Sequence, residues 1–293
     1  MPTDFAKQQP GITLVLGSGG ARGLAHVGVL RALEELKIPI RAIVGCSIGA
    51  EIGAFYCTGM PTATLEAEAC ATRWWGTLRL FFPDFGGGGL SRGVAITQYL
   101  YDRLGDRQIE DFPLPFACVA TDMVTGQEVI LSSGPALPAV RASIALPVML
   151  APQRHGGRIL ADGGLIDPVP IAVARALFPG PLVAVLVHRT QREGAWSPPP
   201  APRTGGDEPT EDIADTVIPD LNILQALRRS VEIMQSHLVN LQMRFASADL
   251  ILAPKLENIQ TLGFHKGEVA VMAGYQATHE AAADLGALLQ QST

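Results

Sequence analysis

Short apolar runs alternate with stretches of helical hydrophobic spacing along most of this 293-residue chain. Residues 12–16 (ITLVL) form a continuous apolar run that stops at a glycine, which is the pattern of a buried parallel strand. Over residues 24–36 a leucine or valine recurs at every third position with charged residues between, which predicts an amphipathic helix. Pro39 ends that helix, and the next apolar run, residues 40–44, predicts a second strand.

The same two patterns predict elements through the rest of the chain. Helices are expected from residue 47 to about 59, then to about 75, and over 94–104, 136–145, 171–177, 221–245 and from about 266 onward. Strands are expected at 116–121, 182–187 and 249–253, and hairpin strands at 127–131 and within 151–161. Residues 81–89, with three phenylalanines and four glycines, are expected to form a mobile loop.

Residues 190–215 follow neither pattern. They are rich in Pro, Gly, Asp and Glu, so a flexible excursion is expected. The apolar runs on both sides of it fit one sheet, so residues 1–293 are expected to form a single α/β domain, with core motifs in 12–190 and residues 220–290 completing it. A right-handed crossover makes the first two strands parallel and adjacent, with the loops that follow them on one edge of the sheet.

Composition narrows the class of protein. Hydrophobic residues make up 47% of the chain, yet no run of about 18 apolar residues occurs, so no membrane span is expected. The N-terminus lacks a basic stretch followed by an apolar core, which argues against a secretory signal, and the four cysteines have no C-x-x-C spacing. A net charge of −6 without a basic cluster argues against nucleic-acid binding. We expect a cytoplasmic protein, with peripheral contact to the inner membrane left open.

The central stretch of the chain is residues 43–50 (IVGCSIGA), where an apolar strand enters Gly-x-Ser-x-Gly and a helix follows. This order is typical of a nucleophile elbow, in which Ser47 occupies a strained turn and small residues at Gly45 and Gly49 let strand and helix approach. With 31 glycines in the chain, this pattern arises by chance in roughly one such chain in eight. The pattern alone therefore does not establish a nucleophile, and the other motifs of the chain are needed.

The loop after the first strand offers donors for an oxyanion. The backbone amides of Gly19, Gly20, Ala21 and Arg22 are candidates, because glycines let amides converge and let a substrate approach. A tight turn without a ligand explains the same glycines equally well. Arg22 either supports the loop or contacts an anion.

Serine also needs a base. A Ser-His-Asp triad would require one of the six histidines, none of which has a recognisable catalytic pattern around it: His26, His155, His188, His237, His265 and His279. Asp162 is the alternative, because it follows a strand and precedes Gly163 and Gly164, which leave room for its carboxylate in a crowded site. Taken alone, Asp-Gly-Gly is more often a plain turn.

Four motifs occur together in this order: LGSGGARGLAHVGVL (16–30), GCSIGA (45–50), RASIALP (141–147) and DGG (162–164). As a set they closely resemble the bacterial patatin-like phospholipases over about residues 12–190. The resemblance implies a three-layer α/β/α fold with a mostly parallel central sheet, and a Ser–Asp dyad in which Ser47 is the nucleophile and Asp162 the base. It also implies an oxyanion hole from Gly19, Gly20 and neighbouring amides, and hydrolysis of acyl esters of lipids through an acyl-enzyme, without metal or cofactor.

Two positions depart from that family's pattern. Ser18 interrupts the glycine run, so the oxyanion loop depends on the φ that Ser18 adopts. Asp167 stands where asparagine is common, and a second carboxylate near Asp162 is expected to raise the pKa of Asp162. An apolar groove beside Ser47 is expected for a lipid, with candidates that core packing explains equally well: Phe81, Phe82, Phe85, Met149 and Leu150.

Other functions are weighed against this one. A dinucleotide-binding turn fails because Arg22 occupies the third glycine position, and because no acidic residue ends the second strand. In an α/β-hydrolase the nucleophile would lie several strands after the oxyanion loop, whereas here one helix and one strand intervene. A catalytically silent scaffold stays open, although intact Ser47 and Asp162 argue against it.

Overall fold

The computed structural model describes residues 10–71, 93–147, 149–188, 223–245 and 247–290. The expected loop at 81–89 and the expected excursion at 190–215 lie outside the described residues. The N-terminal half contains β1 (Ile12–Leu16), η2 (Gly20–Leu24), α1 (Ala25–Glu35), β2 (Ile40–Cys46), α2 (Ile48–Cys57), α3 (Thr62–Cys70), α5 (Val94–Leu104), η3 (Ile109–Asp111), β3 (Phe116–Asp122), β4 (Glu128–Leu131) and α6 (Ala136–Ser143). The remainder contains β5 (Gln153–His155), β6 (Arg158–Asp162), η4 (Gly163–Leu165), α7 (Ile171–Leu177), β7 (Leu182–Val185), α8 (Ile223–Phe245), β8 (Leu250–Leu252), η6 (Phe264–Lys266), α9 (Gly267–Glu280) and α10 (Ala282–Gln290).

The strands form one mixed sheet in the order β5-β6-β3-β2-β1-β7-β8, with β4 paired to β3. The run from β3 to β8 is parallel, whereas β4, β5 and β6 pair antiparallel at the other end. β1 and β2 are adjacent and parallel, as expected, with Leu16 level with Gly45. β8 pairs with β7, so the part of the chain after residue 222 completes the same sheet.

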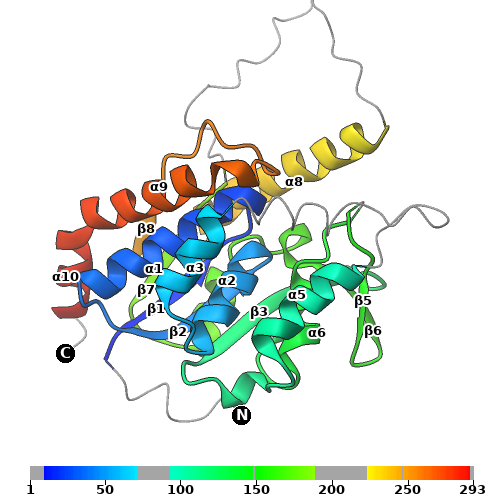
Figure 1. Ribbon diagram of the computed structural model, residues 1–293, viewed down its shortest axis with the longest axis horizontal. Helices are drawn as coiled ribbons and strands as arrows, with labels where there is room; N and C mark the ends of the chain where they lie inside the picture. Colours follow the sequence, from blue (N-terminus) through cyan, green and yellow to red (C-terminus); the bar gives the residue numbers. More distant parts are fainter. Residues whose placement is uncertain (1–9, 72–92, 148, 189–222, 246, 291–293) are drawn as a thin grey trace, which may run out of the picture.

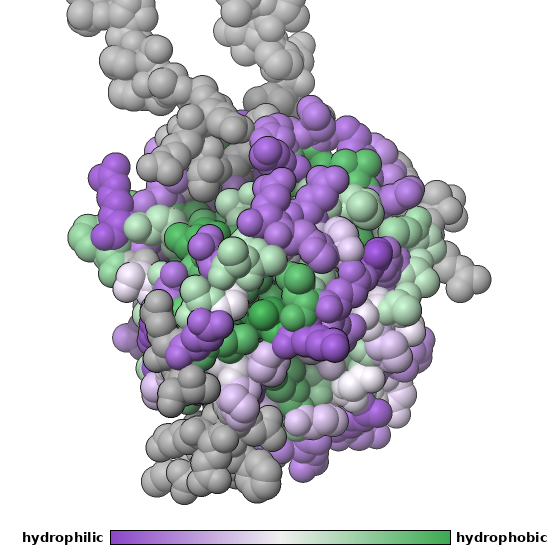
Figure 2. Space-filling view, turned by 90° about the vertical axis from the view of Figure 1, so that its left-hand side faces the viewer, coloured by the Kyte–Doolittle hydropathy of each residue, from purple (hydrophilic) through white to green (hydrophobic). Residues whose placement is uncertain are grey.

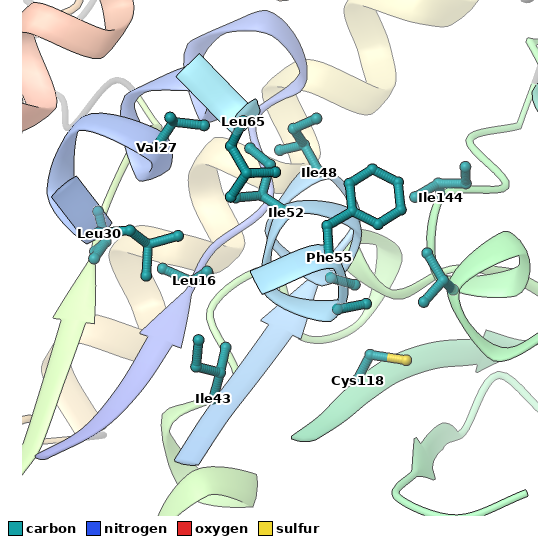
Figure 3. Close-up of a cluster of buried hydrophobic side chains, with 14 of the residues drawn as sticks. Leu16, Val27, Leu30, Ile43, Ile48, Ile52, Phe55, Leu65, Cys118 and Ile144 are labelled. Atoms are coloured by element: carbon teal, nitrogen blue, oxygen red, sulfur yellow. The ribbon is translucent and has the colours of Figure 1, made fainter. Parts of the chain in front are cut away.

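Helices cover both faces of the sheet and give the three layers that the family resemblance implies (Figure 1). Alternation along β1 sends Leu14 and Leu16 into one buried cluster and Val15 into the other. The larger cluster includes residues of α1, α2, α3, α5, α6 and α9, and Figure 3 shows α2 at its centre. The smaller cluster lies under α7 and α8. α2, which begins directly after Ser47, is therefore packed into the larger cluster.

The expected single helix from about residue 266 is wrong in detail. A 3₁₀ turn over Phe264–Lys266 comes first, and α9 and α10 are separate helices that break at Ala281 (φ −93°, ψ 9°). No glycine or proline marks this break, so local pattern carried no signal for it.

The surface on the side of α9 and α10 carries apolar patches separated by hydrophilic side chains (Figure 2). Such mixing is common, because more than half of a folded chain's surface is apolar. Within the described ranges, no helix combines the length and the apolar character that crossing a membrane requires.

Candidate active site

Ser47 lies in a strained turn between β2 and α2. Its backbone has φ 55° and ψ −123°, a conformation that L-residues rarely adopt. The glycines on either side are required by close approach, because a Cβ on Gly45 would lie 2.5 Å from Ala50 Cα and one on Gly49 would lie 2.1 Å from Leu16 O. The elbow expected from Gly-x-Ser-x-Gly is therefore present.

Asp162 reaches Ser47 through the register of three strands. Cys46 of β2 pairs with Val119 of β3, and the next residue of β3, Ala120, pairs with Asp162 at the end of antiparallel β6. The Asp162 carboxylate is therefore level with Ser47, the residue that follows Cys46. Strand pairing alone brings together two side chains that are 115 positions apart in the sequence.

The Ser47 hydroxyl donates a hydrogen bond to Asp162 Oδ2 at 2.6 Å. Asp162 Oδ1 accepts a second bond from the Gly164 backbone N–H at 2.7 Å. Burial raises the pKa of Asp162 to about 6, and these two hydrogen bonds partly oppose that rise. The carboxylate is therefore mostly ionised at pH 7 but close to its midpoint, which suits a general base.

The glycine loop after β1 lines the space beside Ser47 with Ser18, Gly19 and Gly20. The amides of Gly19 and Gly20 donate to no acceptor in the part of the chain that the structure describes. The Ala21 amide instead donates to Thr261 O at 2.8 Å, so of these three expected donors only the two glycine amides remain open. The Arg22 side chain donates to Ile259 O at 2.7 Å and so supports the loop.

Ser18 fits the loop without a left-handed backbone. Among the described residues other than glycine, only Lys37 and Ser47 have positive φ. The Ser18 hydroxyl lies 2.7 Å from His188 Nε2. Desolvation, together with the nearby charge of Arg22, lowers the pKa of His188 to about 4, so the ring is neutral at pH 7. The serine that interrupts the glycine run thus ties the loop to the end of β7.

Among the described residues, no hydrogen bond links Ser47 to a histidine. His26, the nearest in sequence, is buried and bonds to Gly17 O at 2.8 Å. Burial lowers the pKa of His26 to about 4, so it acts as a neutral support of the glycine loop.

Asp167 does not act on Asp162 as expected. Its Oδ1 accepts a hydrogen bond from Gln242 of α8 at 2.5 Å, and Glu128 of β4 lies near enough to perturb the pKa of Asp167. Burial and the Asp167 charge raise the pKa of Glu128. The pKa of Asp162 is raised by its own burial, because the Asp167 carboxylate is turned toward β4 and α8.

The sequence alone did not single out three residues of the site. Ser143 of α6 accepts a hydrogen bond from the Ser47 backbone N–H. It lies in the motif at 141–147, but the motif gave no role to Ser143 itself. Gln235 of α8 and Glu51 of α2 are buried and line the same cavity as Ser47.

This cavity has a volume of about 60 Å³, room for about five groups the size of a water molecule. Of the candidates for an apolar groove, Met149 lines it, Leu150 is buried in the core, and the three phenylalanines lie outside the described residues. Its lining is Ser18, Gly19, Gly20, Ser47, Ile48, Glu51, Ile144, Leu146, Met149, Asp162, Gln235, Thr261, Leu262 and Phe264. Within the described residues, no cluster of three or more His, Cys, Asp or Glu side chains could hold a metal ion.

The family model for patatin-like phospholipases matches residues 14–175, more than half of the chain. The chain belongs to the patatin-like phospholipase family. All four motifs and the Ser47–Asp162 pair lie inside the matched residues. An uncharacterised NTE family protein of Mycobacterium tuberculosis is 42% identical over 164 residues, which cover 56% of this chain and 45% of that protein. Lysophospholipase NTE1 of Pyricularia oryzae is 38% identical over 172 residues, covering 57% and 11%.

The chain thus spans less than half the length of the curated relatives it matches. Among solved structures, VipD from Legionella pneumophila superposes with a TM-score of 0.60 at 14% identity, over 97% of this chain and 67% of that one. At this identity the likeness concerns the patatin fold alone. It covers nearly the whole chain, including the part after residue 175 that the family model leaves out.

Proposed function

We propose that this patatin-like protein hydrolyses acyl esters of lipids through a Ser47–Asp162 dyad. The observation that carries the proposal is the 2.6 Å hydrogen bond from Ser47 Oγ to a buried carboxylate, with Ser47 on a strained elbow. Family membership and the lysophospholipase name of a relative support a lipid ester as the substrate class.

In this mechanism Asp162 takes the proton of Ser47 Oγ as the oxygen attacks the ester carbonyl. The amides of Gly19 and Gly20 stabilise the negative charge that forms on the carbonyl oxygen. Asp162 then returns the proton to the leaving alcohol, and an acyl-enzyme on Ser47 remains. Water attacks the acyl-enzyme with Asp162 again as base, which frees the fatty acid and restores Ser47.

The test measures hydrolysis of p-nitrophenyl esters of short and long fatty acids, together with labelling of Ser47 by a fluorophosphonate. Ser47→Ala and Asp162→Asn are expected to lower kcat by about 10³-fold or more, because each removes a member of the reacting pair. The exposed residues Ser133 and Asp106 provide matched controls, Ser133→Ala and Asp106→Asn, which should keep wild-type rates.

The alternatives predict other results. Full activity of a folded Asp162→Asn variant would rule out the dyad, and loss of activity in His188→Ala with retention in Asp162→Asn would point to a histidine base. A catalytically silent scaffold would neither turn over any ester nor react with the fluorophosphonate at Ser47.

We also propose peripheral contact with the membrane that holds the substrate, through α8. Five side chains on one stripe of α8 are 49–87% exposed: Ile223, Leu227, Met234, Leu241 and Phe245. Gln235 of the same helix lines the cavity, which supports a lipid surface as the occupant of the stripe. Leu241→Glu is expected to lower activity on phospholipid vesicles about fivefold or more, while activity on a water-soluble ester is unchanged. Equal loss on both substrates, or a monomer–dimer shift in wild type, would contradict membrane contact.

A further inference from the structure

Glu51 is a buried carboxyl group in the active-site cavity. It lies on α2 one helical turn after Ser47, and its backbone N–H donates to Ser47 O at 3.0 Å. The side chain is 3% exposed and belongs to the lining of the cavity that also holds Ser47 and Asp162. Its Oε1 is fully buried and has no hydrogen-bond partner among the residues that the structure describes. Buried polar atoms are almost always paired, and the Glu51 side chain lines the cavity, so a molecule bound in the cavity can supply the missing partner.

The surroundings of Glu51 favour the neutral acid. Burial raises its pKa to about 8, although Arg103 of α5 opposes the rise and Glu68 of α3 adds to it. Arg103 does not pair with Glu51, since its guanidinium donates to both carboxylate oxygens of Glu68, at 3.0 and 2.8 Å. Tyr99 of α5 donates to Glu68 as well. At pH 7 Glu51 therefore offers one O–H donor and one carbonyl acceptor.

The cavity limits what can meet this acid. An anionic group would be repelled by Asp162, which lines the same cavity, and a cationic group would need the ionised form of Glu51, which burial disfavours. A plain methylene chain would leave the buried acid unpaired, which weakens binding. A hydroxyl group both accepts and donates, and so matches both functions of the acid. The small volume, about 60 Å³, places that hydroxyl within a few atoms of the reacting carbonyl.

We propose that Glu51 receives a hydroxyl group that the substrate carries close to the scissile ester, and that it thereby selects hydroxylated substrates. This rests on the proposed ester hydrolysis at Ser47. The hydroxyl has two chemical sources. It belongs either to the acyl chain, as in a 3-hydroxyacyl ester, or to the alcohol, as in the free glycerol hydroxyl of a lysophospholipid.

The experiment compares matched pairs of substrates that differ only in this hydroxyl. The acyl arm uses p-nitrophenyl 3-hydroxyhexanoate and hexanoate, and the alcohol arm uses 1-acyl-glycerophosphocholine and its 2-O-methyl ether. Wild type is expected to prefer the hydroxylated member about tenfold or more in kcat/KM in one arm, which identifies the source. Glu51→Met should bring this ratio close to one, while Glu51→Gln should keep most of it, since an amide also donates and accepts.

The control variant is Glu128→Gln, which removes another carboxyl of raised pKa that does not line the cavity. It should leave the ratio unchanged. Ratios near one in both arms for wild type, or a ratio that Glu51→Met does not alter, would overturn the proposal. If Glu51→Met does not fold, the wild-type ratios in the two arms still test the proposal, since ratios near one in both would overturn it.

Binding separates this proposal from the proposed catalysis. Non-hydrolysable ether analogues of each pair can be titrated into Ser47→Ala, whose cavity keeps Glu51. A hydroxyl preference of about tenfold in Kd there supports the role of Glu51 even if no ester is hydrolysed, and its absence overturns that role. Failure of turnover alone counts against the hydrolase mechanism.

Discussion

The hydroxyl of Ser143 accepts a hydrogen bond from the Ser47 backbone N–H at 3.0 Å and donates one to Val119 O at 2.7 Å. Ser143 is fully buried on α6, so it fastens the strained elbow to β3 through a single side chain. The elbow's geometry therefore depends on a residue that is 96 positions from Ser47.

Ser143→Ala is expected to lower kcat about tenfold while KM changes little, because the Ser47 amide loses its partner and Ser47 Oγ moves relative to Asp162. Loss of the two bonds should also lower the free energy of unfolding by about 1–3 kcal/mol. Steady-state kinetics and urea unfolding measure the two effects. A change in stability with kcat intact would mean that Ser143 holds α6 in place but does not position Ser47.

The pH dependence of hydrolysis should report the protonation of Asp162. Only the ionised carboxylate can take the proton of Ser47, and burial raises its pKa to about 6. We expect kcat/KM on a water-soluble ester to fall about tenfold per pH unit well below 6 and to level off near pH 7. Circular dichroism at each pH separates titration from unfolding. A midpoint near 4 would indicate a solvated carboxylate, and a midpoint that moves in His188→Ala would indicate a histidine base.

Much of the fold was predictable because its signals are local. The residues of β1 are apolar except for Thr13 and stop at glycine, and α5 and α7 begin and end where hydrophobic spacing placed them. The order of strands across the sheet was harder to predict from the sequence. The antiparallel return of β6 along β3 depends on pairing between residues about 40 positions apart, such as Thr121 with Ala161, for which the sequence holds no local signal.

The residues of the site also differ in whether a local sequence signal marks them. Ser47 is marked by the glycines that its turn requires, and Asp162 by the glycines after it and by family resemblance. Glu51 carried no such mark, since a glutamate on a helix after residue 47 looks like any surface position until the packing of α3 and α5 buries it. Gln235 is 188 positions from Ser47, and its place in the cavity follows from how α8 crosses the sheet.

The close contact between α2 and β1 gives a sharp stability prediction. A Cβ on Gly49 would lie 2.1 Å from the carbonyl oxygen of Leu16, and backbone meets backbone there, so neither side can move without disturbing the elbow. Gly49→Ala should lower the free energy of unfolding by about 3 kcal/mol or more, measured by urea denaturation. Gly286→Ala on α10 is the control, because no atom lies within 4 Å of its Cβ position, and it should stabilise by about 0.5–1 kcal/mol. Equal effects of the two changes would mean that β1 and α2 are not in contact in solution.

The buried acid of Glu51 should make stability depend on pH in a direction that can be derived. Its pKa is raised to about 8 in the folded chain from an ordinary value of 4.5. Between these values the folded state keeps a proton that the unfolded state has lost, so stability falls as pH rises through this window. The full loss, about 1.4 kcal/mol for each unit of the shift, is present above pH 8.

Glu51→Gln removes this titration while it keeps the shape of the side chain. The variant should therefore melt at a higher temperature than wild type at pH 9 and at nearly the same temperature at pH 4.5, where Glu51 is largely protonated in the folded protein. Thermal melts over this range measure the difference, and Glu280→Gln, at an exposed position on α9, is the control. A difference in melting temperature that does not grow between pH 5 and pH 9 would show that the carboxyl of Glu51 is solvated, and would also remove the reason for a hydroxyl to bind it.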